Sequence, residues 1–207
     1  RAFTPASTTK VLTGLAVLSS LNSEHRFTTS VVRTGNDLVL VGGGDPYLAA
    51  EPARIPQFGI EASLETLAKR TADALREAGV SEVRLSYDAS LFSGPALSPG
   101  WEESYATERI VTPVSALWVD QRGYVGEDAK SLPAPLAAAE FAEQLDDAGI
   151  SVEGDAREGR APSGSTPVAS VRSATVARIT EHMIASSDNE AAEVLLRQAA
   201  IGAGRPG

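Results

Sequence analysis

Two residue types near the start of the chain could carry out nucleophilic chemistry: the serine and the lysine of Pro5-Ala6-Ser7-Thr8-Thr9-Lys10. Proline suits the first turn of a helix, and the mixture of small and large apolar residues in 11–18 predicts a buried helix. On a helix Ser7 and Lys10 are three residues apart, so they share a face. The stretch therefore offers a hydroxyl nucleophile, an amine that could take its proton, and a helix N-terminus that favours negative charge.

Lysine is an informative choice at this position, because the chain otherwise prefers arginine. Its 18 basic residues include only three lysines, Lys10, Lys69 and Lys130. Arginine keeps its proton in proteins, whereas a desolvated lysine can lose its proton and act as a base. A Ser-x-x-Lys sequence also arises by chance about once in a chain of this length, so the motif needs support from elsewhere.

A second candidate lies near the other end of the chain, at Ser187-Asp188-Asn189. Thr175 is expected to cap a helix that runs up to this motif, with apolar residues at helical spacing. Another helix is expected to begin at Glu190, with Asp188 and Glu190 in its acidic first turn. Taken alone, an Asp-Asn pair at a helix start usually serves only as a cap.

The segment between the two motifs mixes strands and amphipathic helices. Alternating and β-branched residues predict strands over 26–34, 37–41, 80–87, 114–119 and 168–172, and one that starts at Val152. Helices are expected to open at Ser63 and Pro135 and to end at Gly79 and Gly149. The glycine run 42–44 lacks the Lys-Ser/Thr of a phosphate loop, so it is interpreted as a backbone turn.

Composition excludes several classes of function. A net charge of −9 and a pI near 4.8 argue against a nucleic-acid or anionic-membrane partner. The absence of cysteine excludes disulfides, thiolate metal sites and a cysteine nucleophile. Neither of the two histidines, His25 and His182, lies in a motif typical of a Ser-His-Asp triad. We expect no metal and no cofactor, and the longest apolar stretch, 11–21, is too short to span a bilayer.

Together the two motifs resemble those of the penicillin-recognising serine acyltransferases, which carry Ser-x-x-Lys, Ser-Asp-Asn and Lys-Thr-Gly. Further stretches are similar to the peptidase S13 family, the D-alanyl-D-alanine carboxypeptidases of the penicillin-binding protein 4 type. These stretches are Asp-Leu-Val-Leu-Val-Gly-Gly-Gly-Asp-Pro at 37–46, Pro99-Gly100-Trp101, and Ala192-Glu193 shortly after Ser187-Asp188-Asn189. The resemblance runs almost the length of the chain.

The resemblance implies an α+β fold: a transpeptidase domain like that of penicillin-binding proteins and β-lactamases, here incomplete, with inserted β-rich α/β domains. Residues 1–28 and 163–207 would belong to the transpeptidase-like domain, and residues 29–162 would form the inserted part. Class A β-lactamases join the two motifs by a shorter, all-helical segment, whereas the strands expected here suit the S13 family. No Lys-Thr-Gly follows Ser187. The site is therefore expected to lack one wall, which a remaining C-terminal segment or a separate chain would supply.

The activity implied by the resemblance is cleavage of peptidoglycan stem peptides through an acyl-enzyme, as a D-Ala-D-Ala carboxypeptidase or an endopeptidase, with inhibition by β-lactams. Ser7 would be the nucleophile and Lys10 the base that takes its proton. Ser187 would relay a proton to the leaving group, and Asn189 would hydrogen-bond the substrate amide and Lys10. Asp88 resembles the family's acidic residue that meets the amine of the third stem-peptide residue, and a solvated turn aspartate is the alternative.

Two other functions stay open at the level of the sequence. A β-lactamase of the same fold would turn penicillin over rapidly, and a non-catalytic cell-wall binding module would bind stem peptides without being acylated. The chain has no initiating methionine, so we expect its natural N-terminus to lie upstream. The implied activity predicts an extracytoplasmic bacterial protein, in the periplasm or the cell wall.

Overall fold

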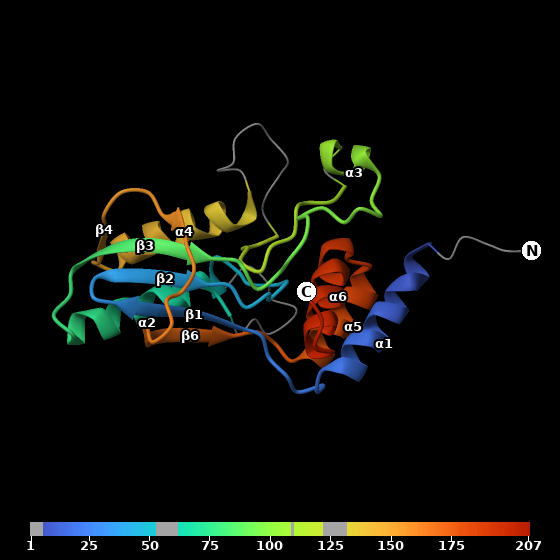
Figure 1. The fold of residues 1–207 in the computed structure, drawn as a ribbon, viewed down its shortest axis with the longest axis horizontal. Coiled ribbons are helices and arrows are strands. Elements are labelled where there is room, and N and C mark those ends of the chain that lie inside the picture. The colour runs from blue at the N-terminus through green and yellow to red at the C-terminus, as the bar shows by residue number, and fades with distance from the viewer. Residues whose placement is uncertain (1–5, 53–61, 109, 122–131) are drawn as a thin grey trace, which may run out of the picture.

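The computed structural model describes residues 6–52, 62–108, 110–121 and 132–207. A mixed sheet with its covering helices lies on one side of the molecule, and a cluster of three helices lies on the other (Figure 1). The chain starts in the helical cluster, crosses to the sheet, and returns to the cluster at its end. Pro5, at the expected start of the first helix, and Lys130 fall outside the described residues.

The sheet has six strands in the order β4-β3-β2-β1-β6, and β5 also pairs with β3. β1 pairs antiparallel with β2 and β6, whereas β3 pairs in parallel with β2, β4 and β5. The turn between β1 and β2 lies at Gly35-Asn36, as the sequence predicts. The strands are β1 (Thr28–Thr34), β2 (Asp37–Val41), β3 (Glu82–Asp88), β4 (Ser151–Val152), β5 (Arg157–Glu158) and β6 (Thr166–Arg172).

Two helices, α2 (Leu64–Glu77) and α4 (Pro133–Asp147), pack together on the sheet. α2 connects the parallel strands β2 and β3, and α4 precedes β4, as parallel pairing requires a crossover connection. The Oγ of Ser63 accepts a hydrogen bond from the Thr66 N–H (3.2 Å), so the predicted cap of α2 is confirmed. Both helices end before glycines with positive φ, Gly79 (70°) and Gly149 (83°), which confirms the predicted ends.

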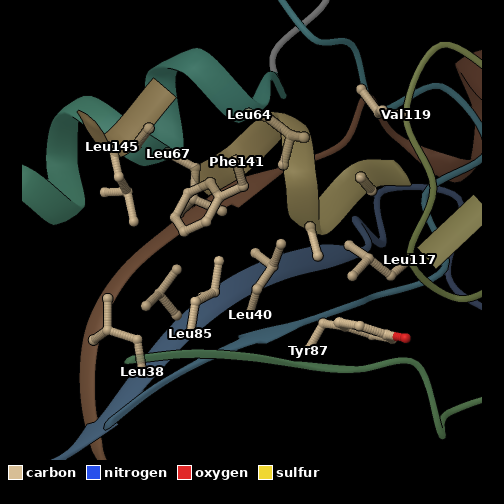
Figure 2. Close-up of a cluster of buried hydrophobic side chains, with 14 of the residues drawn as sticks. Leu38, Leu40, Leu64, Leu67, Leu85, Tyr87, Leu117, Val119, Phe141 and Leu145 are labelled. Carbon is tan, nitrogen blue, oxygen red and sulfur yellow. The ribbon is translucent and has the colours of Figure 1, made fainter. Parts of the chain in front are cut away.

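The larger hydrophobic core lies between this helix pair and the sheet. Figure 2 shows side chains of α2 and α4 pointing toward side chains of β2 and β3. Full burial of one such side chain contributes roughly 1.5–3 kcal/mol. The labelled residues are Leu64 and Leu67 of α2, Phe141 and Leu145 of α4, Leu38 and Leu40 of β2, Leu85 and Tyr87 of β3, and Leu117 and Val119.

The helical cluster consists of α1 (Lys10–Ser20), α5 (Val176–Ser186) and α6 (Asn189–Gly202). A short 3-10 turn, η1 (Ala6–Thr9), leads into α1. Val17, Ile179 and Leu195, one residue from each helix, are fully or almost fully buried in a second hydrophobic core. α1 and α5 approach closely at Gly14, where an added Cβ would lie 3.1 Å from Cγ2 of Thr180.

The prediction that the first helix is buried is wrong. Val11, Leu12, Leu15 and Leu18 are all exposed, and only Lys10, Gly14 and Val17 of α1 are buried. One face of α1 packs against α5 and α6. The apolar pattern continues around the helix, so the opposite face presents large apolar side chains to solvent in the part of the chain that the structure describes.

Two further elements differ from the sequence prediction. Residues 114–119 are buried but form no strand. The Ala116 carbonyl accepts the Gly44 N–H (2.8 Å), just beyond the end of β2, but the segment pairs with no described strand, so the apolar run reflects burial and not sheet pairing. A short helix, α3 (Glu103–Thr107), was not expected.

The predicted domain boundaries remain predictions. β1 begins at Thr28 and β6 begins at Thr166, just after the proposed boundary at residue 163. The two strands pair along most of their length, from Thr28 with Arg172 to Arg33 with Thr166. The sheet therefore joins the segment that enters the proposed insertion to the segment that leaves it.

The glycine run after β2 lies where three chain segments pass very close together. An added Cβ at Gly42 would lie 2.4 Å from the Ala116 carbonyl oxygen, and one at Gly43 would lie 2.1 Å from the Thr28 carbonyl oxygen. Both obstacles are backbone atoms, which cannot move aside as a flexible side chain could. The run is therefore a site of close backbone approach, in agreement with its interpretation as a structural element.

We predict that Gly43→Ala lowers the free energy of unfolding by more than about 3 kcal/mol, because the new methyl group would force β1 and β2 apart. Gly100→Ala is the matched control, since its Cβ would have no neighbour nearer than 3.8 Å. The control should change the free energy by less than about 1 kcal/mol. Denaturant unfolding of both variants checks this, and equal stabilities would contradict the close approach.

Candidate active site

Ser7 and Lys10 lie on consecutive turns at the start of the first helical segment. Ser7 belongs to η1, not to the α-helix itself, and Lys10 is the first residue of α1. The tight turn still brings them together, with Lys10 Nζ 3.3 Å from Ser7 Oγ. Ser7 is exposed, whereas Lys10 is buried, so the hydroxyl is open to a ligand while the amine is shielded from water.

The Ser187-Asp188-Asn189 motif forms the corner between α5 and α6. Ser187 ends α5 in the left-handed conformation (φ 57°, ψ 39°), which is uncommon for a residue other than glycine. Asp188 caps α6, because its Oδ1 accepts the Ala191 N–H (2.8 Å). Asn189 is the first residue of α6. A reversal of only two residues therefore presents both Ser187 and Asn189 on the same side of the corner.

Lys10 connects this corner to the start of the chain. Its Nζ donates to Oδ1 of Asn189 (2.7 Å) and lies 3.4 Å from Oγ of Ser187. Together with Oγ of Ser7, these two atoms make three neutral oxygen acceptors for the three N–H groups of the Lys10 ammonium. Within the described residues, Lys10 contacts no carboxylate in a salt bridge. The structure thus brings together four of the five predicted site residues: Ser7, Lys10, Ser187 and Asn189.

This arrangement can support acyl transfer. An uncharged Lys10 would be able to accept the Ser7 proton over the observed 3.3 Å, a separation typical of catalytic pairs before substrate binds. Ser187 is close enough to the same nitrogen to pass that proton onward. Asn189 fixes the amine through the shortest of the three contacts and keeps its amide N–H₂ for another partner.

Asp88, the fifth predicted site residue, lies at the end of β3 and is not joined to this cluster by any described contact. Its carboxylate accepts the backbone N–H groups of Ser90 and Ala161, each at 2.9 Å. Burial alone would raise the pKa of Asp88, but these hydrogen bonds outweigh burial and hold the pKa below its ordinary value. An ionised Asp88 therefore organises the loops around it, and its predicted role toward a substrate amine remains a prediction.

Two residues that the sequence argument did not single out contact the central motif. The Tyr47 hydroxyl donates to Oδ2 of Asp188 (3.2 Å), and Nε2 of Gln121 donates to the same oxygen (2.9 Å). Tyr47 follows directly on the Gly-Gly-Gly-Asp-Pro stretch, which was a signal for that region but not for the side chain. Gln121 lies in a turn with no recognisable motif, so only the fold reveals it.

The acidic residues beside the motif are partly or fully buried. Glu190 accepts the Thr112 N–H (3.0 Å), and burial raises its pKa above the ordinary value. Asp45 is fully buried, and burial raises its pKa to about 7, although its hydrogen bond from the Tyr47 N–H (2.9 Å) acts in the opposite direction. Asp45 therefore exchanges a proton near neutral pH in the native protein.

The described part of the chain contains neither a cluster of metal-ligating side chains nor a helix that could span a membrane. No group of three or more histidine or acidic side chains there could hold a metal ion. None of the described helices is both long and apolar enough to cross a membrane.

An exposed serine beside a shielded lysine, together with a Ser-Asp-Asn corner from the other end of the chain, matches two of the three motifs of the penicillin-recognising serine acyltransferases. Comparison with known proteins narrows this class. A family model described as the D-Ala-D-Ala carboxypeptidase 3 (S13) family matches residues 1–131 and 127–207. The chain belongs to the peptidase S13 family.

Two curated relatives are similar over almost the whole chain. Carboxypeptidase Rv3627c of Mycobacterium tuberculosis is 33% identical over 213 residues, which cover 98% of this chain and 44% of the relative. Carboxypeptidase DacB of Mycolicibacterium smegmatis is 32% identical over 211 residues, with the same two coverages. The chain thus spans less than half the length of these relatives.

A solved structure supports the fold. Penicillin binding protein 4 (dacB) of Haemophilus influenzae superposes with a TM-score of 0.74 at 19% identity, over 99% of this chain and 59% of that one. A second structure of that protein, complexed with a novel β-lactam, superposes with a TM-score of 0.66 over 98% of this chain. The expected α+β fold, incomplete in this chain, is confirmed: the chain has an open mixed sheet, and it covers only part of the matching structure.

We predict that Asp45→Asn makes the free energy of unfolding less dependent on pH. Between the unfolded pKa near 3.8 and the native value of about 7, the native state keeps a proton that the unfolded state has released. Stability attributable to Asp45 therefore falls as pH rises through this window, by at most about 1.4 kcal/mol per unit. The free energy of unfolding of Asp45→Asn should therefore increase relative to that of the natural protein from pH 4 to pH 7. Above pH 7 the difference between the two proteins should stay constant.

Denaturant unfolding at several pH values measures this difference. Asp73→Asn is the control, because Asp73 is largely exposed and its change should leave a nearly flat difference. A difference between Asp45→Asn and the natural protein that does not change from pH 4 to pH 8 would contradict the buried, protonated aspartate.

Proposed function

We propose that the natural protein containing this sequence is a serine-type D-Ala-D-Ala carboxypeptidase that cleaves peptidoglycan stem peptides through an acyl-enzyme and is inhibited by β-lactams. The observation that carries the proposal is the contact of Lys10 Nζ with Ser7 Oγ on one side and with Ser187 Oγ and Asn189 Oδ1 on the other. Membership of the S13 family and the curated carboxypeptidases similar to this chain support it.

In the acylation step, Ser7 Oγ attacks the carbonyl carbon between the two D-alanines, and its proton passes to an uncharged Lys10. The new Oγ–C bond gives a tetrahedral intermediate with a negatively charged oxygen. The Ser7 backbone N–H is one of the donors for that oxygen, and loss of such a donor typically costs about 10²–10³ in rate. Collapse of the intermediate breaks the C–N bond and leaves the acyl group on Ser7.

The leaving D-alanine needs a proton on its nitrogen as the C–N bond breaks. Lys10 holds the proton taken from Ser7, and Ser187, 3.4 Å from its Nζ, hands the proton to the leaving amine. Asn189 accepts from Lys10 through Oδ1 and offers its N–H₂ to the substrate amide. Water then attacks the acyl-enzyme with Lys10 as the base, which restores Ser7 and releases the shortened peptide.

Inhibition by β-lactams follows from the same chemistry. The H. influenzae penicillin binding protein 4 has been solved in complex with a β-lactam. In the protein described here the β-lactam carbonyl would acylate Ser7, and the ring-opened product would stay attached because its leaving group cannot diffuse away. A peptidoglycan substrate requires an extracytoplasmic location in a bacterium, which we include in the proposal. We also propose that Asp88 contacts the amine of the third stem-peptide residue.

A third motif completes the proposed site. We propose that a Lys-Thr-Gly strand, in a further part of the natural protein or in a separate chain, packs against the exposed apolar face of α1. Val11, Leu12, Leu15 and Leu18 form that face and are between 43% and 66% exposed. The curated relatives are more than twice as long as the matched region, which leaves ample chain for such a partner.

The role of Ser7 is tested with a fluorescent penicillin on the natural polypeptide that contains this sequence. Ser7→Ala should abolish covalent labelling, because no other hydroxyl occupies the position of the nucleophile. Ser19→Ala, which alters an exposed serine of α1, should label normally. Undiminished labelling of Ser7→Ala would sink the proposed mechanism.

The role of Lys10 is tested with Lys10→Arg, which keeps the charge but removes the ability to act as a base. We expect acylation to slow by about 10²–10⁴, the usual contribution of a general base. Lys69→Arg, on an exposed part of α2, is the matched control and should acylate at the normal rate. Stopped-flow labelling measures both, and a rate for Lys10→Arg within threefold of normal would argue against a base at this position.

The covering of α1 is tested with Leu15→Asp in the same polypeptide. If a strand covers this face, the substitution buries an unpaired charge and should lower the free energy of unfolding by several kcal/mol. Leu91→Asp is the control, because Leu91 is exposed on a loop away from α1 and should tolerate the change. Equal, small effects of the two substitutions would mean that the face of α1 stays in solvent.

A further inference from the structure

The carboxylate of Asp188 has more hydrogen bonds than a helix cap requires. Its Oδ1 accepts the Ala191 N–H (2.8 Å), which completes the cap of α6. Its Oδ2 accepts two side-chain donors, the Tyr47 hydroxyl (3.2 Å) and the Gln121 amide (2.9 Å). These donors come from segments 141 and 67 residues away in the chain. Local helix formation explains the first oxygen but not the second.

Tyr47 is held so that its hydroxyl has little freedom. Its backbone N–H donates to the buried Asp45 carboxylate (2.9 Å), and its ring meets the His182 ring edge-to-face at 5.0 Å. Burial and the nearby Asp188 raise the pKa of Tyr47 above its ordinary value, so its hydroxyl keeps its proton throughout the physiological range. Tyr47 is therefore held beside Asp188 with a protonated hydroxyl that donates to it.

Gln121 reaches Asp188 from a strained turn. Asp120 and Gln121 both have φ near 51°, a backbone conformation that aspartate adopts more readily than most residues and that is uncommon for glutamine. Asp120 is fixed by two hydrogen bonds, from its own N–H to the Leu48 carbonyl (2.9 Å) and from the Ala50 N–H to its Oδ1 (3.1 Å). The turn thus directs the Gln121 amide to the corner.

The corner that accepts the Gln121 hydrogen bond also contains a strained residue. Ser187, immediately before Asp188, also has a positive φ (57°). Strained conformations persist only where the surrounding structure holds them, and they concentrate at functional sites. Here the strained residue Ser187 and the helical residue Asn189 are the two corner residues that contact Lys10, and Asp188 lies between them.

We propose that Tyr47 and Gln121 are positioning residues, which act through Oδ2 of Asp188 to hold Ser187 and Asn189 in register with Lys10. Neither residue touches Ser7 or Lys10 in any described contact. Each instead contacts Asp188, which lies in the chain between the two corner residues that contact Lys10. The consequence for acylation rests on the proposed function, whereas the consequence for the geometry of the corner does not.

The test uses three substitutions in the natural polypeptide that contains this sequence. Tyr47→Phe removes one hydroxyl and keeps the ring against His182, and Gln121→Met removes the amide donor with little change of shape. Asp188→Ser keeps a side chain that caps helices as well as aspartate does, but it removes the second oxygen. Ser63→Ala, which removes the cap of the distant helix α2, is the control for a loss of stability alone.

The first measurement is the rate constant for acylation by a penicillin, well below the melting temperature of each variant. We expect Tyr47→Phe and Gln121→Met each to lower it about tenfold, as for loss of a hydrogen bond to a charged group. Tyr47→Phe should have no further effect when added to Asp188→Ser, because the oxygen it acts on is already gone. Ser63→Ala should acylate at the normal rate.

The second measurement is amide hydrogen exchange of a peptide spanning residues 184–191, which needs no activity. Tyr47→Phe and Gln121→Met should speed exchange of this peptide at least threefold, whereas Ser63→Ala should leave it unchanged. If the natural protein is not acylated at all, the proposed function fails, and exchange still decides whether the two residues hold the corner.

Two results would overturn the proposal. One is unchanged exchange of the corner peptide in both single variants, which would mean that Tyr47 and Gln121 do not hold it. The other is faster exchange with a normal acylation rate, or a full additional loss when Tyr47→Phe is combined with Asp188→Ser. Either form of the second result would mean that the two residues do not act on the chemistry through Asp188.

Discussion

The structure depends on holding one buried lysine amine between oxygens that come from opposite ends of the chain. A buried ammonium is costly unless its N–H groups are hydrogen-bonded, and here Ser7, Ser187 and Asn189 provide the three acceptors. This requirement fixes the helical cluster. α1 has to lie against the corner of α5 and α6, and the close approach at Gly14 permits it, because an added Cβ there would lie 3.1–3.2 Å from two side chains of α5.

The sheet supports the corner at a distance from the chemistry. Gln198 of α6 donates to the carbonyls of Gly43 (2.8 Å) and Gly44 (3.1 Å), directly after β2. The indole of Trp118 donates to the carbonyl of Asp45 (3.2 Å), so the segment 114–119 is anchored to the same place. The glycine run is thus the joint between the two halves of the molecule. A bulky residue there would push the helical cluster away from the sheet and from the segments that support the corner.

The features that the sequence predicted correctly depend on interactions between residues that are close together in the chain. The caps at Ser63 and Thr175, the glycines that end α2 and α4, and the Ser-x-x-Lys spacing each depend on neighbours within a few residues, and the structure contains all of them. The failures depend on distant contacts. Burial made 114–119 look like a strand, and the apolar face of α1 looked buried because periodicity does not reveal which partner covers a helix. Tyr47 and Gln121 had no local signal, since their partner lies far away in sequence.

The one carboxylate of the corner has partners other than Lys10. Asp188 lies in the chain between the two corner residues that contact Lys10. The Asp188 carboxylate is occupied by the α6 backbone on one oxygen and by Tyr47 and Gln121 on the other. Lys10 keeps only neutral acceptors among its described contacts. The hydrogen bonds that orient the corner therefore occupy both oxygens of its carboxylate.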